Sequence, residues 1–169
     1  RHRLRNERSV ERIAEQRVAT EFGEFTLLAY QDHVHRDVHL ALVRGTITPE
    51  GPPPLVRVHL TETLRDILGV GGEGRHWTLR AAMARIAREG HGVIVILREA
   101  ETPRQLADAV QALARPGEAT APPAEGTPVL RTYGIGAQIL KDVGVRRMRV
   151  LSAPKQLHGL SAFDLEARS

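Results

Sequence analysis

The chain has 169 residues, 41% hydrophobic and 26% charged, which is the composition of an ordinary globular domain. Its longest apolar run, Val93 to Leu97, is far too short to span a bilayer, and the Arg-rich start has no apolar leader. The 24 basic residues are spread along the chain and only 4% of residues are aromatic, which argues against nucleic-acid binding. Without cysteine the chain has neither disulfides nor thiolate metal ligands, so we expect a cytoplasmic protein.

The first half of the chain predicts a surface helix followed by strands. Residues 1–17 are polar and basic with a thin apolar stripe, which is typical of a surface helix. Glu24 to Gln31 predicts a strand, and Val38 to Arg44 predicts its hairpin partner across a turn. After a Pro-rich loop, Leu55 to Leu60 predicts a further apolar strand.

The middle of the chain alternates between helix and strand signals. Thr61 to Leu68 predicts a short helix ended by Gly69, and the glycine-rich run 69–74 predicts a loop. Leu79 to Glu89 predicts a helix that is closed by Gly90, and Gly92 to Leu97 predicts a buried strand.

A second capped helix follows. Thr102-Pro103-Arg104-Gln105 is a capping box with proline at the first helical position. We expect this helix to reach about Ala114 and to bury its apolar face, which consists of Leu106, Ala109, Val110 and Leu113. Residues 116–128 are rich in Pro, Ala, Gly and Glu and predict a mobile linker.

A further helix is predicted from Tyr133, with Thr132 as its cap and Gly144 as its end. Gly134 and Gly136 would lie in its first turn, where they favour either close packing against a sheet or an anion at the helix N-terminus. Short strands at Met148 to Leu151 and Phe163 to Leu165 complete the alternation. We therefore predict an α/β layered domain, with a mixed β-sheet flanked by helices.

The amino-acid sequence of the helix predicted from Tyr133 resembles a motif of a known family. Residues 133–140 read Tyr-Gly-Ile-Gly-Ala-Gln-Ile-Leu, which resembles the signature helix of GTP cyclohydrolase II, a zinc enzyme of riboflavin synthesis. His39 to Val43 resembles a second family motif, and the likeness extends with gaps from about Ala19 to Leu165. It implies a cyclohydrolase-like domain over residues 18–169 that forms a homodimer, with residues 1–17 as a connecting helix. In bifunctional members the upstream half is a 3,4-dihydroxy-2-butanone 4-phosphate synthase. Because the chain starts at Arg1 without that half, we expect a fragment of such a protein.

The resemblance fails at the residues that the family's chemistry requires. The three zinc-binding cysteines of the family fall on Glu62, Glu73 and Arg75, and its catalytic aspartate falls on Val129. The permanent charge of a guanidinium repels a metal cation, and valine can neither accept nor donate a proton. We therefore expect no zinc and no cyclohydrolase activity. Less favoured alternatives are another metal at Glu62, Glu73 and His76, or altered chemistry that uses these glutamates with His59 or His76.

Several polar family positions are retained and could form an anion pocket for a nucleotide or flavin phosphate. They could equally be inherited scaffold residues, so both a ligand-sensing module and a dimerising or regulatory domain stay open. These candidate residues are Arg57, His59, Arg131, Ser152 and Lys155. A separate group of His33, His35 and His39 invites a metal-site interpretation, against which solvated surface histidines are the commoner case.

Overall fold

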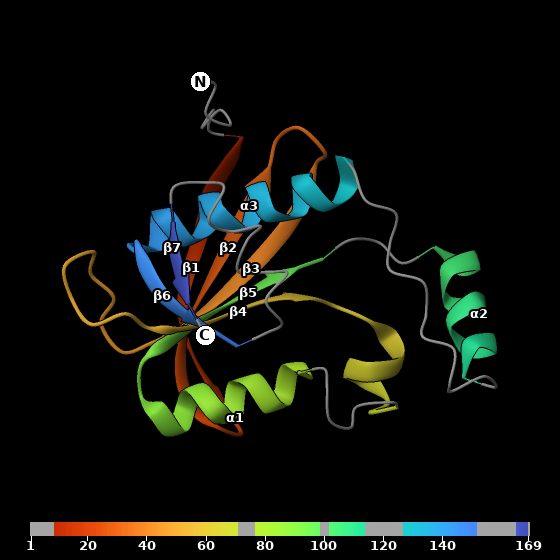
Figure 1. The fold of residues 1–169 in the computed structure, drawn as a ribbon, viewed down its shortest axis with the longest axis horizontal. Coiled ribbons are helices and arrows are strands. Elements are labelled where there is room, and N and C mark those ends of the chain that lie inside the picture. Colours follow the sequence, from red (N-terminus) through yellow and green to blue (C-terminus); the bar gives the residue numbers. More distant parts are fainter. Residues whose placement is uncertain (1–8, 71–76, 99–101, 114–126, 152–164, 169) are drawn as a thin grey trace.

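A mixed β-sheet runs through the middle of the domain in the computed structural model (Figure 1). The structure describes residues 9–70, 77–98, 102–113, 127–151 and 165–168, without the side chains of 127–131 and 168. Within these ranges the sheet has seven strands in the order β1-β2-β3-β5-β4-β6-β7. The strands are β1 (Val10–Thr20), β2 (Gly23–Asp32), β3 (Asp37–Arg44), β4 (Leu55–Leu60), β5 (Gly92–Leu97), β6 (Arg147–Val150) and β7 (Glu166–Arg168). The helices are η1 (Thr63–Ile67), α1 (Leu79–Glu89), α2 (Pro103–Ala112) and α3 (Thr127–Val143).

The sheet joins an antiparallel half to a parallel half at β5. Strands β1, β2, β3 and β5 pair antiparallel, whereas β4 pairs parallel with both β5 and β6. The predicted hairpin is confirmed, with Leu28 opposite Ala41 across β2 and β3. All six residues of β5 are buried, because helices cover both faces of the sheet here. The predicted α/β layered domain is therefore confirmed.

Alternate residues of β4 and β5 serve two separate hydrophobic clusters. Val58 and Val95 belong to a cluster with Ile139 and Leu140 of α3. On the opposite face, Leu55, Ile94 and Ile96 pack with Ala82 and Ile86 of α1. The side chains of β4 that follow Leu55 at two-residue spacing, Arg57 and His59, therefore lie on the α1 side of the sheet.

Helix α1 and strand β5 have the predicted bounds. Thr78 caps α1 by accepting a hydrogen bond from the Ala81 N–H at 3.0 Å, and Gly90 ends it with φ of 80°. The capping box of α2 is also confirmed. The short helix before Gly69 is present as the single turn η1, and β6 begins and ends one residue earlier than predicted. Of the predicted last strand, 163–165, the structure describes only Leu165, and strand β7 follows it from Glu166.

The predicted helix over residues 1–17 is wrong for residues 10–17, and residues 1–8 lie outside the described ranges. Residues 10–20 form the edge strand β1, which pairs with β2 from Val10–Asp32 to Thr20–Gly23. The start of β1 is held by Gln138 of α3, whose side-chain oxygen accepts from the N–H groups of Ser9 and Val10. A ladder to a neighbouring strand therefore overrides the weak helical stripe.

The signature helix begins earlier than predicted. Helix α3 starts at Thr127, so Thr132 lies inside it and is not its cap. Residues 127 and 128 of the predicted linker belong to this helix, and residues 116–126 lie outside the described ranges. Gly134 and Gly136 are consequently not in the first turn, and the idea that they face an anion at the helix N-terminus is wrong. A Cβ on Gly136 would lie 3.4 Å from Val58 Cγ1, which supports close packing against β4. Gly144 ends the helix as predicted, with φ of 113°.

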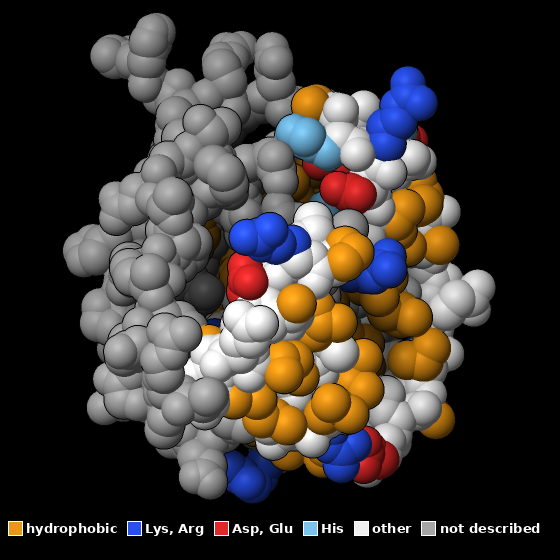
Figure 2. All heavy atoms as spheres, turned by 90° about the vertical axis from the view of Figure 1, so that its right-hand side faces the viewer, with side chains coloured by type: hydrophobic (Ala, Val, Ile, Leu, Met, Phe, Trp, Pro, Cys, Tyr) orange, Lys and Arg blue, Asp and Glu red, His pale blue; other side chains and the backbone are white. Residues whose placement is uncertain are grey.

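Helix α2 does not bury its apolar face as predicted. It stands beside η1 and apart from the sheet, and it has no buried residue. Val110 is 51% exposed and Leu113 is 47% exposed, and Ile67 and Leu68 near η1 are exposed as well. Figure 2 shows hydrophobic side chains gathered on this side of the molecule. Helical periodicity thus identified an amphipathic helix but not what lies against it.

Substitution by alanine should have opposite effects on stability at Gly92 and at Gly136. A Cβ on Gly92 would lie 2.7 Å from the Leu55 carbonyl oxygen and 2.8 Å from Ile86 Cγ2, and backbone cannot easily move. We expect Gly92→Ala to lower the free energy of unfolding by about 2 kcal/mol. Gly136→Ala meets only ordinary contacts and should be neutral or add up to about 1 kcal/mol through helix propensity. Urea unfolding of both variants is the measurement, and equal effects would contradict the described packing.

The exposure of α2 is testable by polar substitution. Val110→Gln should change the free energy of unfolding by less than about 0.5 kcal/mol, because the side chain already faces solvent. Val95→Gln, at a fully buried position of β5, should lower it by more than about 3 kcal/mol. A large loss for Val110→Gln in thermal or urea unfolding would show that α2 is packed against the domain after all.

Candidate functional site

The candidate site lies at the carboxyl end of β4, where an open parallel arrangement usually places functional side chains. Arg57 and His59 project from the same face of the strand towards α1 and η1. His59 is 1% exposed, so its ring nitrogens must find partners inside the protein. These partners are the side chains of Arg57 and Asp66.

Arg57 is bound by protein acceptors in three directions. Its Nε donates to His59 Nδ1 at 3.2 Å, and its terminal nitrogens donate to the carbonyl oxygens of Leu151 at 3.2 Å and Trp77 at 3.4 Å. Burial, followed by the neighbouring charge of Arg65, lowers the pKa of Arg57 from its ordinary value. The guanidinium therefore ties β4 to the end of β6 and to the start of α1.

His59 forms hydrogen bonds to both Arg57 and Asp66 and so connects the two side chains. Because Arg57 can only donate, His59 Nδ1 must be the acceptor, and the proton must lie on Nε2. His59 Nε2 then donates to Asp66 Oδ1 at 2.9 Å and Oδ2 at 3.0 Å. Burial lowers the pKa of His59, and this effect outweighs the attraction of the Asp66 carboxylate. The histidine is neutral at pH 7.

Asp66 accepts two backbone hydrogen bonds in addition. The Glu62 N–H lies 2.8 Å from Oδ2, and the Leu79 N–H lies 3.1 Å from Oδ1. Burial alone would raise the pKa of Asp66, but the hydrogen bonds from Glu62, His59 and Leu79 lower it overall. Sequence reasoning missed Asp66, since a carboxylate within an exposed-looking helical turn gives no signal of its contacts.

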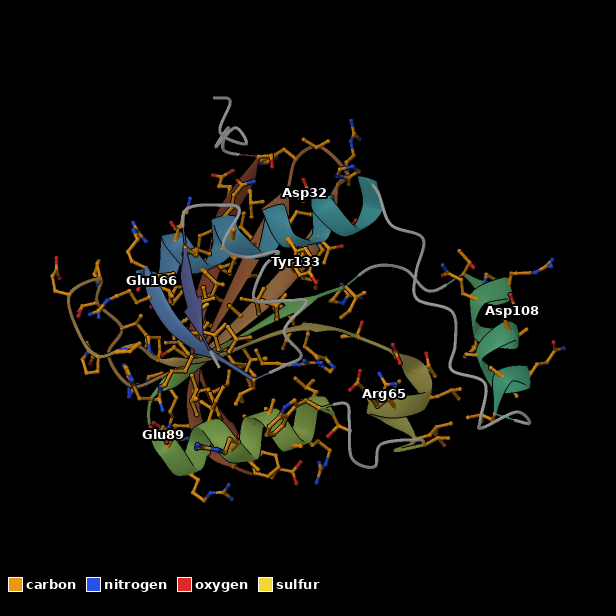
Figure 3. The ribbon with its side chains drawn as sticks, viewed as in Figure 1. Asp32, Arg65, Glu89, Asp108, Tyr133 and Glu166 are labelled. Atoms are coloured by element: carbon orange, nitrogen blue, oxygen red, sulfur yellow. The ribbon has the colours of Figure 1, made fainter. Side chains whose placement is uncertain are left out.

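Of the other candidate residues, Glu62 forms an ion pair, and for the rest the structure does not describe the side chain. Glu62, at the first family zinc position, forms a 2.9 Å ion pair with Arg65 on η1, which Figure 3 labels. The structure thus brings together Arg57, His59 and Glu62 of the sequence-predicted residues. Those not described are Glu73, Arg75, His76, Ser152 and Lys155, together with the side chains of Val129 and Arg131.

The three histidines of the β2–β3 hairpin do not converge. His33 bonds to Glu11 at 2.8 Å and His35 to Asp32 at 3.1 Å. His39 is buried, and its Nδ1 accepts from the Arg98 N–H at 2.9 Å. Among the residues that the structure describes, no three His, Asp or Glu side chains are grouped so that they could hold a metal ion.

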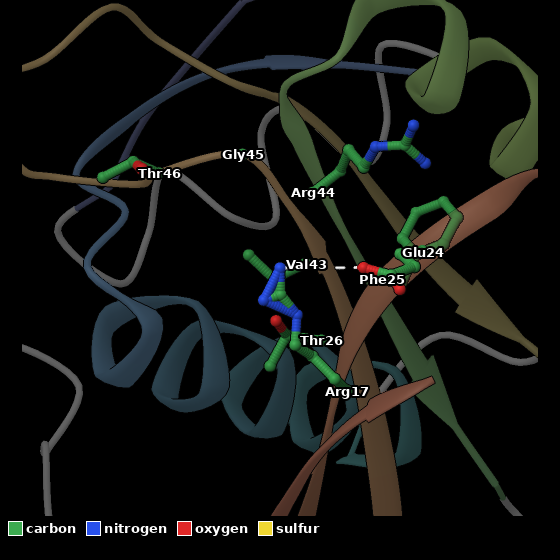
Figure 4. Close-up of a pocket in the computed structure, with 8 residues that line it drawn as sticks. All are labelled: Arg17, Glu24, Phe25, Thr26, Val43, Arg44, Gly45 and Thr46. Carbon is green, nitrogen blue, oxygen red and sulfur yellow. Dashed lines mark ion pairs between the residues drawn. The ribbon is translucent and has the colours of Figure 1, made fainter. Parts of the chain in front are cut away.

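A separate cavity of about 500 Å³ lies over β2 and β3, and Figure 4 shows the residues that line it. Its two arginines are already engaged: Arg17 pairs with Glu24 at 3.7 Å, and Arg44 donates to the Phe22 carbonyl at 3.1 Å. Arg44 also lies 5.2 Å from the centre of the Phe25 ring. None of the candidate site residues lines this cavity, so we assign it no part in the site at β4.

Fold and site together define a mixed α/β domain whose β4 site is filled by its own arginine, histidine and aspartate. The family model described as GTP cyclohydrolase II matches residues 11–169. The chain belongs to the GTP cyclohydrolase II family.

Individual relatives extend this result. The chain is 47% identical over 165 residues to a 3,4-dihydroxy-2-butanone 4-phosphate synthase from Pseudomonas aeruginosa, covering 98% of this chain and 44% of that protein. It is 39% identical over 171 residues to the riboflavin biosynthesis protein RibBA of Bacillus cereus, covering 98% of this chain and 43% of that protein. The chain therefore spans less than half the length of these relatives.

A solved structure agrees with the same assignment. It is RibBX, a two-domain 3,4-dihydroxy-2-butanone 4-phosphate synthase from A. baumannii, with 30% identity and a TM-score of 0.64. The match covers 97% of this chain and 41% of that one. In the described part of the chain, no helix is long and apolar enough to cross a membrane.

The protonation state of His59 predicts how stability depends on pH. Its pKa in the folded chain lies below the unfolded value of 6.5, so between these values the unfolded chain binds a proton that the folded chain does not. The stabilisation is complete above pH 6.5 and is lost as the pH falls towards the folded pKa. We expect the free energy of unfolding to fall from pH 7 to pH 5 more steeply for the wild type than for His59→Gln.

Urea unfolding at several pH values is the measurement. Glutamine can still accept from Arg57 and donate to Asp66, but it does not titrate in this range. His33→Gln removes a histidine that is 54% exposed and serves as the matched control. Equal slopes for the wild type and His59→Gln would contradict the neutral, buried histidine.

Proposed function

We propose that this chain is a cyclohydrolase-like domain that does not turn over GTP and instead supports an attached 3,4-dihydroxy-2-butanone 4-phosphate synthase. The observation that carries the proposal is the commitment of Arg57 and His59 to internal partners. Both groups donate to or accept from protein atoms of the same domain. A site that is to bind a nucleotide needs donors that are directed towards the ligand.

The chemistry of the family's zinc positions supports loss of activity. A zinc ion makes hydroxide available at neutral pH by lowering the pKa of bound water to about 7. The residues at these positions do not fit that ion, because Arg75 carries a permanent positive charge and Glu62 already pairs with Arg65. The buried guanidinium of Arg57 adds further positive charge next to the first position. Val129 supplies no acid or base at the family's aspartate position.

The synthase partnership is supported by the relatives. Two of them are named 3,4-dihydroxy-2-butanone 4-phosphate synthase, and more than half of each lies outside the matched region. We assign the synthase activity to the other part of the polypeptide. The role that is then left for this domain is dimerisation or regulation. We propose a homodimer, as the family resemblance implies.

The test is an assay of the parent polypeptide for both activities. We expect no formate release from GTP, with or without added zinc, and normal conversion of ribulose 5-phosphate by the synthase. Removal of residues 1–169 should reduce the synthase rate or its dimerisation if the domain has the supporting role. Zinc-dependent formate release would refute the loss of activity, and an unchanged synthase dimer after removal would refute the supporting role.

A further inference from the structure

Strand β1 is a long strand at one edge of the sheet. It has 11 residues, with β2 on one side and, within the described part of the chain, no strand on the other. Strand β7, at the opposite edge, has only 3 residues. The outer side of an edge strand carries backbone N–H and C=O groups that can pair with a further strand. Of the two edges, β1 is therefore the one that is long enough to accept such a partner.

A β-bulge divides β1 into two parts. The register with β2 shifts between Arg12 and Ala14. Before the bulge, Arg12 is bound to α3 by an ion pair with Asp142 at 2.7 Å. After it, the ladder with β2 runs without interruption to Thr20, and residues 14–17 are all exposed. The part of β1 after the bulge is thus regular on its inner side and open on its outer side.

The side chains after the bulge alternate between the two faces of the sheet. Glu15 lies opposite Leu28, whose side chain belongs to the cluster under α3. Glu15 and Arg17 are therefore on the α3 side. The even-numbered residues of 14–18 are on the other side, where Val18 packs against the cluster under α1. Charged residues thus lie on one face and uncharged residues on the other.

We propose that the part of β1 after the bulge pairs antiparallel with the same part of a second copy of this chain, with Gln16 on the two-fold axis. Glu15 of one copy then lies opposite Arg17 of the other, and symmetry repeats this pair. On the α1 side, Ala14 lies opposite Val18 of the other copy, and the two Gln16 amides can donate to and accept from each other. The inference rests on the homodimer of the proposed function and names the surface that forms it.

Neighbouring registers of the same pairing are disfavoured. An axis at Glu15 would place two glutamates directly opposite each other, and an axis at Arg17 would do the same with two arginines. An axis between two residues would place residues from different faces opposite each other, which a regular ladder does not permit. The charge pattern therefore favours an axis at Gln16.

The ion pairs that these side chains form within one copy are weak competitors. Arg17 lies 3.7 Å from Glu24, and both side chains are about 70% exposed. Glu15 lies 3.3 Å from Arg12 and is 57% exposed. Exposed ion pairs of this kind contribute little to stability, so Glu15 and Arg17 can exchange these partners for a second copy at small cost.

The proposed register is testable by cross-linking, because the chain has no cysteine of its own. Residues directly opposite each other in an antiparallel pair have Cα atoms about 4.5 or 5.5 Å apart, which a disulfide can span. We expect Gln16→Cys to form a covalent dimer under mild oxidation, seen on a non-reducing gel. Ala19→Cys, also exposed on β1, is the matched control. Its two thiols would lie about 20 Å apart along the strands and should not cross-link.

Charge reversal tests the same surface without a covalent bond. Arg17→Glu places only carboxylates opposite one another and should raise the dimer dissociation constant at least about tenfold in sedimentation equilibrium. Combining Glu15→Arg with Arg17→Glu inverts both ion pairs and should restore the wild-type value. Arg104→Glu, an exposed arginine on α2, is the control and should leave the dimer unchanged.

The two experiments separate the surface from the proposed homodimer. A wild-type dimer that Arg17→Glu does not weaken, or equal cross-linking of Gln16→Cys and Ala19→Cys, would overturn pairing through β1 while the homodimer stands. A wild-type chain that stays monomeric at every concentration would refute both.

Discussion

The hydrogen bond from His59 Nε2 to Asp66 is the interaction on which the site depends. Both side chains are almost completely buried, so neither can exchange its partner for water without a large cost. Because the proton lies on Nε2, Nδ1 is left to accept from Arg57, which in turn reaches the backbone of Leu151 and Trp77. This chain of hydrogen bonds therefore connects β4 to η1, to the residue after β6 and to the residues before α1.

The domain combines the family fold with polar residues on β4 that are bonded to other parts of the same domain. The GTP cyclohydrolase II family membership is clear over residues 11–169, and Arg57 and His59 remain on β4. In this chain they face internal acceptors and a carboxylate, and their donors are used within the domain. Function depends on such local geometry more than on the fold, so family membership alone does not establish the activity.

Within the candidate site, the sequence predicted residue positions but not their partners. Arg57 and His59 could be identified from the family motif, and their shared face follows from strand periodicity. Asp66 could not, because its contacts to Glu62, Leu79 and His59 depend on how η1 folds back on β4. The candidates at Arg131, Ser152 and Lys155 remain predictions.

The sequence by itself determined the elements whose signals are local. Helix α1, strand β5 and the β2–β3 hairpin follow from periodicity, capping residues and turn chemistry within about ten residues. Tertiary structure decided the rest: β1 became a strand because β2 offered a ladder, and α3 extended back to Thr127. Tertiary structure also left the apolar face of α2 exposed. The sequence could not predict this, because helical periodicity shows that a face is apolar but not what packs against it.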